Sequence, residues 1–335
     1  MPKEIAHWVF ARKALDVLDT DSPFRRVIES NIHLYYAGAV ALDSPFYYTY
    51  GRDWKIYRGI GTRLHDTRDS FSYLRGLLAY SREKHPDAAW PFVMGLLAHI
   101  VADSVFHPFV IYFSGDSHRK KPRERSRITY RHAMLETMMD LYFMNDAVLP
   151  FGHSYGDCLR RMEIPMADFE DLLYVLYSSE GQFHPERIKQ YLRKHARFQG
   201  MFDKIWPHFL FGLINLLTLD TFRYFLAIFY PLRRPDPKSL FLYPVAYRNP
   251  LTGERMVASV RDLSDRVRDG IAEWLRKAES LWGSDSIWEL FGDEHGPNLK
   301  TGEPDTKSED MQFFNTDVDI KSVIFQREGS PFYYA

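Results

Sequence analysis

The sequence has one cysteine in 335 residues, Cys158, so an intrachain disulfide and a cysteine-rich zinc ribbon are both excluded. Its charges nearly cancel, with 43 Lys and Arg against 44 Asp and Glu, which argues against a protein that coats nucleic acid through a basic field. The first residues lack the apolar core and cleavage site of a signal peptide, so we expect a cytoplasmic location. What is left is a globular chain of one or two domains.

Long uninterrupted apolar runs are also scarce. The best candidate, residues 209–232, is long enough to span a bilayer, but Asp220 and Arg223 lie within it, where charges are costly in lipid. Two interpretations stay open. The segment is either a buried pair of core helices or an interfacial element that touches a membrane when the substrate is a lipid.

Most of the chain has apolar residues at helical spacing, and strand signals are limited to a short run at 322–326. We predict helices over 3–19, 68–85, 89–107, 129–146, 166–178, 186–198, 201–230 and 259–282. Residues 249–254 indicate a turn before the last of these helices, which Ser259 or Asp262 would cap. The predicted fold class is all-α. A helical catalytic domain would cover 1–232, and a C-terminal extension over 233–335 would end in a loop-rich tail packed on the core.

Three polar residues share one face of the predicted helix at 89–107, which is otherwise apolar. His99, Asp103 and His107 lie four residues apart, so they line up along about 12 Å of the helix axis. A buried carboxylate needs a partner, and a metal ion bound jointly by His and Asp would provide one. His132 and Glu136 repeat the spacing on the next helix. Each pattern alone also fits an ordinary helix, but the two together favour a metal site.

These motifs belong to a longer series that resembles the zinc-dependent phospholipase C family. That family includes bacterial phosphatidylcholine-preferring phospholipases C and the N-terminal domain of glycosylphosphatidylinositol-specific phospholipase D, and fungal single-strand nucleases share its fold. The matching stretches, in order, are AHWVFARK at 6–13, AGAVALDSPFYY at 37–48, RLHD at 63–66, GLLAHIVADSVFHP at 95–108 and RHAMLE at 131–136. The resemblance implies a multi-helix domain with up to three zinc ions.

The resemblance also implies which residues bind each metal. One ion would be held by Asp43, His65, His99 and Asp103. A second would be held by His107, His132 and Glu136. The third would be held by His7 and by Asp103, which would bridge it to the first ion. In the phospholipases C the mature N-terminal residue completes this third site. Only six residues precede His7 here, fewer than in those enzymes, so we expect two to three zinc ions per chain. Iron or manganese are the alternatives in a cytosol poor in free zinc.

The implied chemistry is hydrolysis of phosphate esters by metal-activated water. By resemblance, Asp43 would orient the water or act as its general base. The leading hypothesis is a zinc-dependent, phospholipase C-like phosphodiesterase acting on a lipid or small phosphodiester, with peripheral membrane contact and no stable nucleic-acid partner. A nuclease or nucleotidase using the same site is one alternative, and a non-catalytic protein that keeps its metals as structural clamps is another.

Two further features lie close to the candidate ligands in the sequence. The basic stretch 118–127 falls between His107 and His132, and would form either an electropositive lip beside the metals or a solvated insertion. Asp66 and Asp140 lie beside or one turn from ligands, so they are candidates to accept a hydrogen bond from a ligand histidine. His195 has no ligand-like spacing and is given no role.

Overall fold

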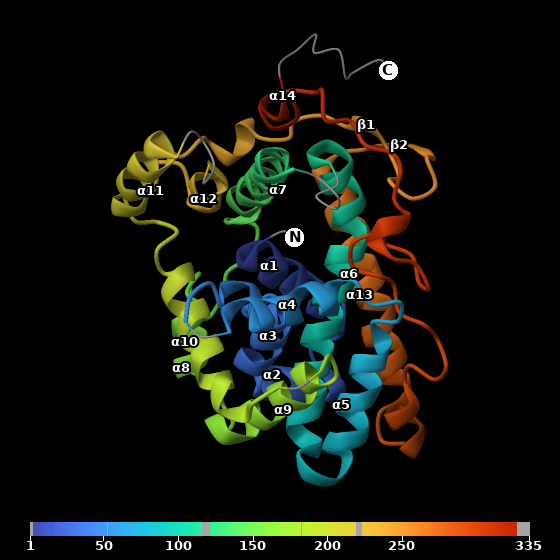
Figure 1. The fold of residues 1–335 in the computed structure, drawn as a ribbon. Helices are drawn as coiled ribbons and strands as arrows, with labels where there is room; N and C mark the ends of the chain where they lie inside the picture. The colour runs from blue at the N-terminus through green and yellow to red at the C-terminus, as the bar shows by residue number, and fades with distance from the viewer. Residues whose placement is uncertain (1–2, 52, 116–120, 182, 219–222, 327–335) are drawn as a thin grey trace.

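The computed structural model describes the whole chain except residues 1–2, 52, 116–120, 182, 219–222 and 327–335 (Figure 1). Helices make up 64% of it and strands 3%, so the predicted all-α class is confirmed. The helices are α1 (Glu4–Leu15), α2 (Pro23–Ser30), α3 (Ile32–Ala41), α4 (Trp54–His65), α5 (Phe71–Lys84), α6 (Pro86–Ser114), α7 (Pro122–Phe143), α8 (Tyr155–Arg160), α9 (Met166–Ser178), α10 (Ile188–Gln199), α11 (Trp206–Leu217), α12 (Arg223–Ile228), α13 (Val260–Leu281) and α14 (Ile320–Ile324).

The core is built around α1, α3 and α6. Ten of the twelve residues of α1 are buried, as expected of a helix that is apolar on nearly every side. Figure 1 shows α1 and α3 in the middle of the molecule, between α10 and α8 on one side and α6, α5 and α13 on the other. The motifs around His7 and His99 therefore lie on helices of the core, α1 and α6.

A glycine crossing sets the distance between α3 and α6. A Cβ atom on Gly95 would lie 2.1 Å from the carbonyl oxygen of Tyr35, and one on Gly38 would lie 2.5 Å from that of Phe92. The two backbones therefore touch at a point that no larger residue could occupy. Because Asp43 follows α3 directly and His99 lies one turn after Gly95, this crossing brings the two side chains together.

Among the described residues, one helical stretch, Ala88–Ser114 in α6, is long and apolar enough to cross a membrane. However, 83% of its most apolar segment is buried inside the protein, as in a core helix. The candidate run at 209–232 is different. It overlaps two short helices, α11 and α12, which replace the single predicted helix over 201–230.

Two other local predictions were wrong. The expected strand at 322–326 overlaps helix α14, which begins where the Asp319 side chain accepts a hydrogen bond from the backbone of Lys321. The polar composition of 114–127, which includes the basic stretch, predicts a loop, but residues 122–127 form the first turns of α7; residues 116–120 lie outside the described residues.

The strands lie elsewhere, in a hairpin that the sequence signals did not reveal. Strand β1 (Val245–Arg248) pairs with β2 (Arg255–Ala258) in antiparallel register. The predicted turn at 249–254 connects them. Ser259 then caps α13 in a capping box with Asp262, as the sequence indicates.

Candidate metal centre

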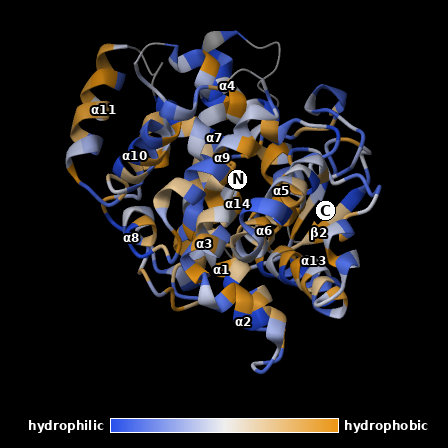
Figure 2. Ribbon diagram, turned by 90° about the horizontal axis from the view of Figure 1, so that it is seen from below, coloured by the Kyte–Doolittle hydropathy of each residue, from blue (hydrophilic) through white to orange (hydrophobic). Residues whose placement is uncertain are grey.

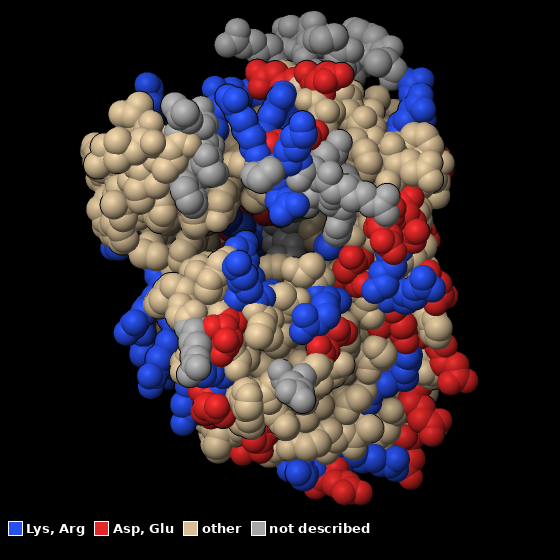
Figure 3. All heavy atoms as spheres, viewed as in Figure 1, with Lys and Arg blue, Asp and Glu red and all other residues tan. Residues whose placement is uncertain are grey.

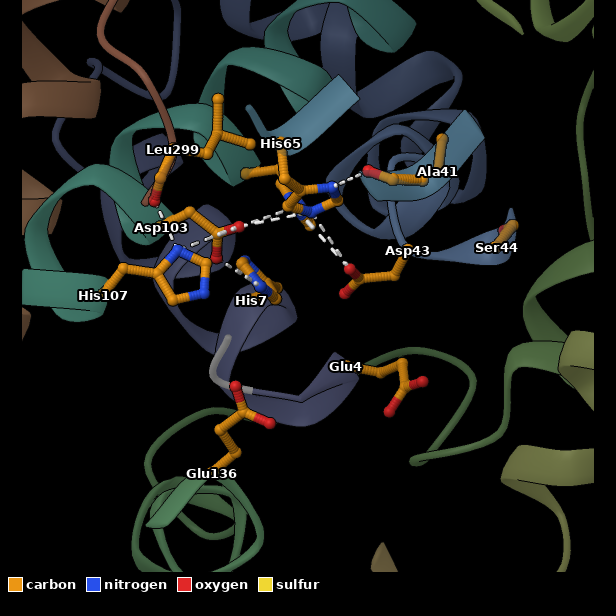
Figure 4. A network of polar contacts seen from close by, with 12 residues as sticks. Glu4, His7, Ala41, Asp43, Ser44, His65, Asp103, His107, Glu136 and Leu299 are labelled. Carbon is orange, nitrogen blue, oxygen red and sulfur yellow. Dashed lines mark hydrogen bonds and ion pairs between the residues drawn. The ribbon is translucent and has the colours of Figure 1, made fainter. Parts of the chain in front are cut away.

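Asp103 lies at the centre of the candidate site, with histidines on both sides (Figure 4). Its Oδ2 atom is 3.2 Å from Nε2 of His99, 3.4 Å from Nε2 of His65 and 3.8 Å from Nδ1 of His107. Its Oδ1 atom is 3.4 Å from Nε2 of His7. All five side chains are buried. The four-residue spacing on α6 therefore places its polar stripe against α1 and α4.

Four donor atoms around this point have the spacing of a zinc site. Ligand atoms at the corners of a tetrahedral zinc site lie about 3.3 Å apart. In this protein Nε2 of His65 lies 3.3 Å from Oδ1 of Asp43, 3.4 Å from Oδ2 of Asp103 and 3.3 Å from Nε2 of His99. His99 lies 3.2 Å from Asp103 and 4.0 Å from Asp43. Asp43, His65, His99 and Asp103 thus gather as the resemblance implies.

Several of these buried atoms have no hydrogen-bond partner among the described residues. They are both carboxylate oxygens of Asp103, Oδ1 of Asp43 and both ring nitrogens of His7. Buried polar atoms are nearly always satisfied, because leaving a carboxylate or imidazole without a partner is costly. A cation between these atoms would satisfy them together, so the residues present fit a metal ion.

The rings of His65 and His99 are oriented by hydrogen bonds on their far side. Nδ1 of His65 donates to the carbonyl oxygen of Gly61 at 2.7 Å, and Nδ1 of His99 donates to that of Ala39 at 2.8 Å. Because these bonds keep a proton on Nδ1, Nε2 is the ring nitrogen left to bind a metal, and in both residues it faces the centre of the site. Such outer hydrogen bonds are the usual way in which proteins fix the tautomer of a metal-binding histidine.

A separate group combines His107 of α6 with His132 and Glu136 of α7, whose ligand atoms lie within 4.8 Å of one another. Nε2 of His132 lies 2.6 Å from Oε1 of Glu136. Nδ1 of His107 donates to the carbonyl oxygen of Leu299, which comes from the C-terminal part of the chain. Figure 4 shows Glu136 pointing toward His7 and His107 from the opposite side.

The eight candidate ligands therefore fall into three groups that could hold metal ions: His7 with Asp43 and His99, His65 with His99 and Asp103, and His107 with His132 and Glu136. The first two groups share His99, and the third has no member in common with them. In the phospholipases C the N-terminal residue completes the third metal position. Residues 1 and 2 of this chain lie outside the described residues.

The charges of the site act strongly on its histidines. Burial alone would lower the pKa of His99, but the carboxylates of Asp103 and Asp43 outweigh it and raise that pKa to about 9. Burial and the neighbouring His99 lower the pKa of His7. Although burial opposes it, the pKa of the Asp103 carboxyl lies well below its usual range because His99 and His107 face it. The site thus holds an ionised carboxylate in the core, as a cation site requires.

Asp66 and Asp140 do not orient a ligand histidine, which corrects the sequence prediction. Asp66 instead accepts hydrogen bonds from Asn298, at 3.0 Å, and from the backbone and hydroxyl of Ser308, at 2.8 and 2.6 Å. Asp140 accepts from the backbone of Ala6 and the hydroxyl of Tyr230, both at 3.0 Å. The backbone carbonyls of Gly61 and Ala39 accept the hydrogen bonds from His65 and His99 instead.

Sequence reasoning missed a buried polar chain beside Asp43. The Ser44 hydroxyl lies 2.8 Å from Nδ1 of His195, and Nε2 of His195 lies 3.0 Å from Oε1 of Glu4. Tyr47 donates to the same Glu4 oxygen and stacks on the His195 ring, with centroids 4.2 Å apart. Burial favours the neutral form of Glu4, but the bond from His195 lowers its pKa overall. Glu4 and His195 are 191 positions apart, so no short sequence pattern could predict their contact.

Part of the candidate site opens onto a pocket with a volume of about 400 Å³, which Figure 3 shows as a hollow in this face of the molecule. Five of the candidate ligands line it: Asp43, His65, His107, His132 and Glu136. Its apolar wall includes Ile111, Ile128, Ala133, Tyr224, Phe225 and Ile228. Its cationic residues are Lys3, Arg58 and Lys300. One pocket therefore combines metal-binding groups, an apolar wall and positive charge.

The family model for zinc-dependent phospholipase C matches residues 6–205, which is more than half of the chain and includes all eight candidate ligands. No curated protein and no solved structure matches the chain. Helices α11 to α14 and the hairpin lie beyond the matched residues. With the buried His and Asp groups and the helical fold, the match shows that this chain belongs to the zinc-dependent phospholipase C family.

Proposed function

We propose that the protein is a metal-dependent phosphodiesterase that cleaves the bond between glycerol and phosphate in a phospholipid. The observation that carries the proposal is the composition of the pocket. Its floor has candidate metal ligands, one wall is apolar, and Arg58 and Lys300 add positive charge. A phospholipid has matching parts, because its phosphate is anionic and its glycerol carries acyl chains.

The chain's own residues would divide the work in a simple way. Zinc ions held by the three groups would activate water near neutral pH and offset the negative charge of the phosphate. Asp43 would accept the proton from the attacking water through the carboxylate oxygen that does not bind metal, since its side chain lines the pocket. Arg58 and Lys300 would draw in the phosphate, and the apolar wall formed by α12 and α7 would hold the diacylglycerol part.

The reaction adds one water across the phosphorus–oxygen bond. The water oxygen stays on phosphorus, and the glycerol oxygen leaves with a proton as diacylglycerol. A phosphorylated headgroup is the second product. Apolar residues at the pocket would keep other water away from the reacting groups.

Two measurements test the proposal in sequence. Elemental analysis of protein purified without chelators gives the number of metal ions per chain, and two to three zinc ions are expected. The zinc-loaded protein is then assayed with a soluble short-chain phosphatidylcholine, and the phosphorylated headgroup is followed by ³¹P NMR. Asp43→Asn should abolish turnover while leaving the fold intact. A zinc-loaded protein that releases no phosphate monoester from any phospholipid class would refute the proposal.

The same site allows two other activities, which the same samples distinguish. A nuclease or nucleotidase would cleave single-stranded DNA or nucleotides in preference to lipid, with binding that weakens steeply as salt increases. A non-catalytic protein would bind zinc and gain stability from it without turnover of any phosphodiester. The apolar pocket wall favours the lipid substrate over both.

A further inference from the structure

Helix α11 has an apolar surface that the described part of the chain leaves uncovered. Its sequence, WPHFLFGLINLL, contains no Lys, Arg, Asp or Glu. Six of its side chains are between 45% and 76% exposed: Trp206, Phe209, Leu210, Leu213, Leu216 and Leu217. Figure 2 shows α11 as a largely hydrophobic helix at the edge of the molecule. Contiguous apolar surface of this kind marks an interaction site.

This surface is continuous with the wall of the catalytic pocket. On its inner side, Phe211 of α11 stacks on Phe225 of α12 with ring centroids 4.7 Å apart and planes 12° from parallel. It also stacks on Phe229, at 5.6 Å. Phe225, in turn, lines the pocket with its neighbour Tyr224. A lipid lying on α11 would therefore be one helix away from the candidate metal ligands.

Positive charge borders the same surface. Lys121, just before α7, and Arg123, Arg125 and Arg127 in its first turns are all exposed, and the same segment has a single acidic residue, Glu124. Helix α12 packs on α7, and Arg223 at its start lies over the ring of Tyr130, 4.5 Å from its centroid. Figure 3 shows Lys and Arg side chains gathered beside the largely uncharged lobe over α11 and above the hollow of the pocket.

We propose that α11 lays its exposed face in the surface of an anionic phospholipid bilayer, with the basic start of α7 on the headgroups and α12 beside the incoming lipid. The bilayer as the source of substrate rests on the proposed function. A second copy of the chain fits less well, because an interface between two such faces would bring two basic clusters together. An anionic bilayer complements both the apolar face and the charge.

Binding to vesicles tests this directly, using the tryptophan fluorescence of the zinc-loaded full chain, in which Trp206 is the tryptophan of α11. Vesicles of brominated phosphatidylcholine, with or without phosphatidylglycerol, should quench that fluorescence, and more strongly when phosphatidylglycerol is present. The variant F209S/L213S/L217S should bind at least about tenfold more weakly. Val148→Ser is the matched control, because Val148 is 92% exposed but lies beside Arg12 and Glu29. It should bind like the wild type.

The charge component is tested separately. The variant K121E/R123E should lose roughly fivefold in affinity for phosphatidylglycerol vesicles per charge changed, while its binding to neutral vesicles stays the same. Equal binding by the wild type and F209S/L213S/L217S would overturn the proposal. A wild-type dimer in light scattering that this triple variant abolishes would also overturn it, in favour of a second copy.

Turnover of a soluble short-chain substrate separates this inference from the proposed function. F209S/L213S/L217S should keep that turnover and lose activity only on vesicles. If the wild type binds vesicles but hydrolyses no phospholipid in either form, the membrane contact stands and the proposed activity fails. If soluble turnover is present but vesicle binding is absent, the activity stands and the role of α11 fails.

Discussion

The imidazole ring of His7 lies parallel to that of His99, with centroids 4.1 Å apart and ring planes 7° from parallel. The stack joins α1 to α6 inside the core, yet both ring nitrogens of His7 lack a hydrogen-bond partner among the residues that the structure describes. Nδ1 of His99, in contrast, donates to the carbonyl of Ala39. A buried imidazole without a partner is destabilising, so the position of His7 is best explained by a metal ion that His7 and Asp103 bind together.

Asp103→Asn should remove at least one zinc ion per chain and lower turnover by at least about 100-fold. The physical reason is that the two Asp103 oxygens face different histidines. In the variant an amide nitrogen replaces one of these oxygens, and it has no free lone pair to donate to a metal ion. Elemental analysis and the headgroup assay measure both effects. Asp140→Asn is the control, because Asp140 is equally buried but belongs to none of the three groups. An Asp103→Asn protein with full zinc content and activity would rule out a metal role for Asp103.

His132→Ala should remove one zinc ion and leave the others bound. Its group, with His107 and Glu136, shares no residue with the groups around His99. The zinc content per chain, compared before and after dialysis, should therefore fall by one and not collapse to zero. Loss of all zinc would mean that the three groups bind their ions as a single cooperative unit.

The parts of the site that could be predicted from the sequence are those with local spacing. His99, Asp103 and His107 on α6, and His132 and Glu136 on α7, follow from four-residue intervals on helices. Joining them to His7, Asp43 and His65 required the family resemblance, since no periodicity connects residues on different helices. The contact between α3 and α6 depends on Gly38 and Gly95, which are 57 positions apart.

Long-range contacts explain what the sequence did not reveal. The carbonyl of Leu299 that accepts the hydrogen bond from His107 is 192 positions away in the chain, and His195 contacts Glu4 across 191 positions. The strand prediction at 322–326 was wrong because five residues are too few to distinguish helical from strand periodicity. The Asp319 side chain, which caps the helix at 320–324, favours the helix.

Asp66→Ala should lower the free energy of unfolding by about 2 kcal/mol. The mutation removes the acceptor for Asn298 and Ser308, which tie the C-terminal segment to the residue after His65. Urea unfolding followed by circular dichroism gives the change. Glu294→Ala is the control, since Glu294 is exposed and its nitrogen–oxygen distance to Lys277 is 3.9 Å. It should change stability by less than about 0.5 kcal/mol.

The stabilisation by Asp66 should also depend on pH. Although burial opposes ionisation, Lys300 and the bonds from Ser308 lower the pKa of Asp66 to about 2. The unfolded chain takes up this proton near pH 4. The difference in stability between wild type and Asp66→Ala should therefore be full above about pH 4 and shrink as pH falls toward 2. A difference that stays constant down to pH 2 would show that the carboxylate charge contributes nothing.

Asp140 should give the opposite pH dependence. Burial and the nearby Glu4 raise the pKa of Asp140 to about 7, in spite of Lys3 and the bonds from Ala6 and Tyr230. The folded protein therefore keeps this proton up to about pH 7, whereas the unfolded chain releases it near pH 4. Because the folded state binds more protons in this window, Asp140 lowers the free energy of unfolding as pH rises from about 4 to about 7.

Asp140→Asn removes this dependence while keeping both hydrogen bonds, since the amide oxygen can accept from Ala6 and its nitrogen can donate to Tyr230. Lys3, whose pKa burial lowers to about 8, stays charged below that pH and adds no slope in the window. The variant should gain stability over the wild type between pH 4 and pH 7, on the order of 3 kcal/mol in all. Urea midpoints across this range measure the gain. Parallel curves for the two proteins would mean that Asp140 is ionised in the folded state throughout, held by Lys3 more strongly than its burial disfavours the charge.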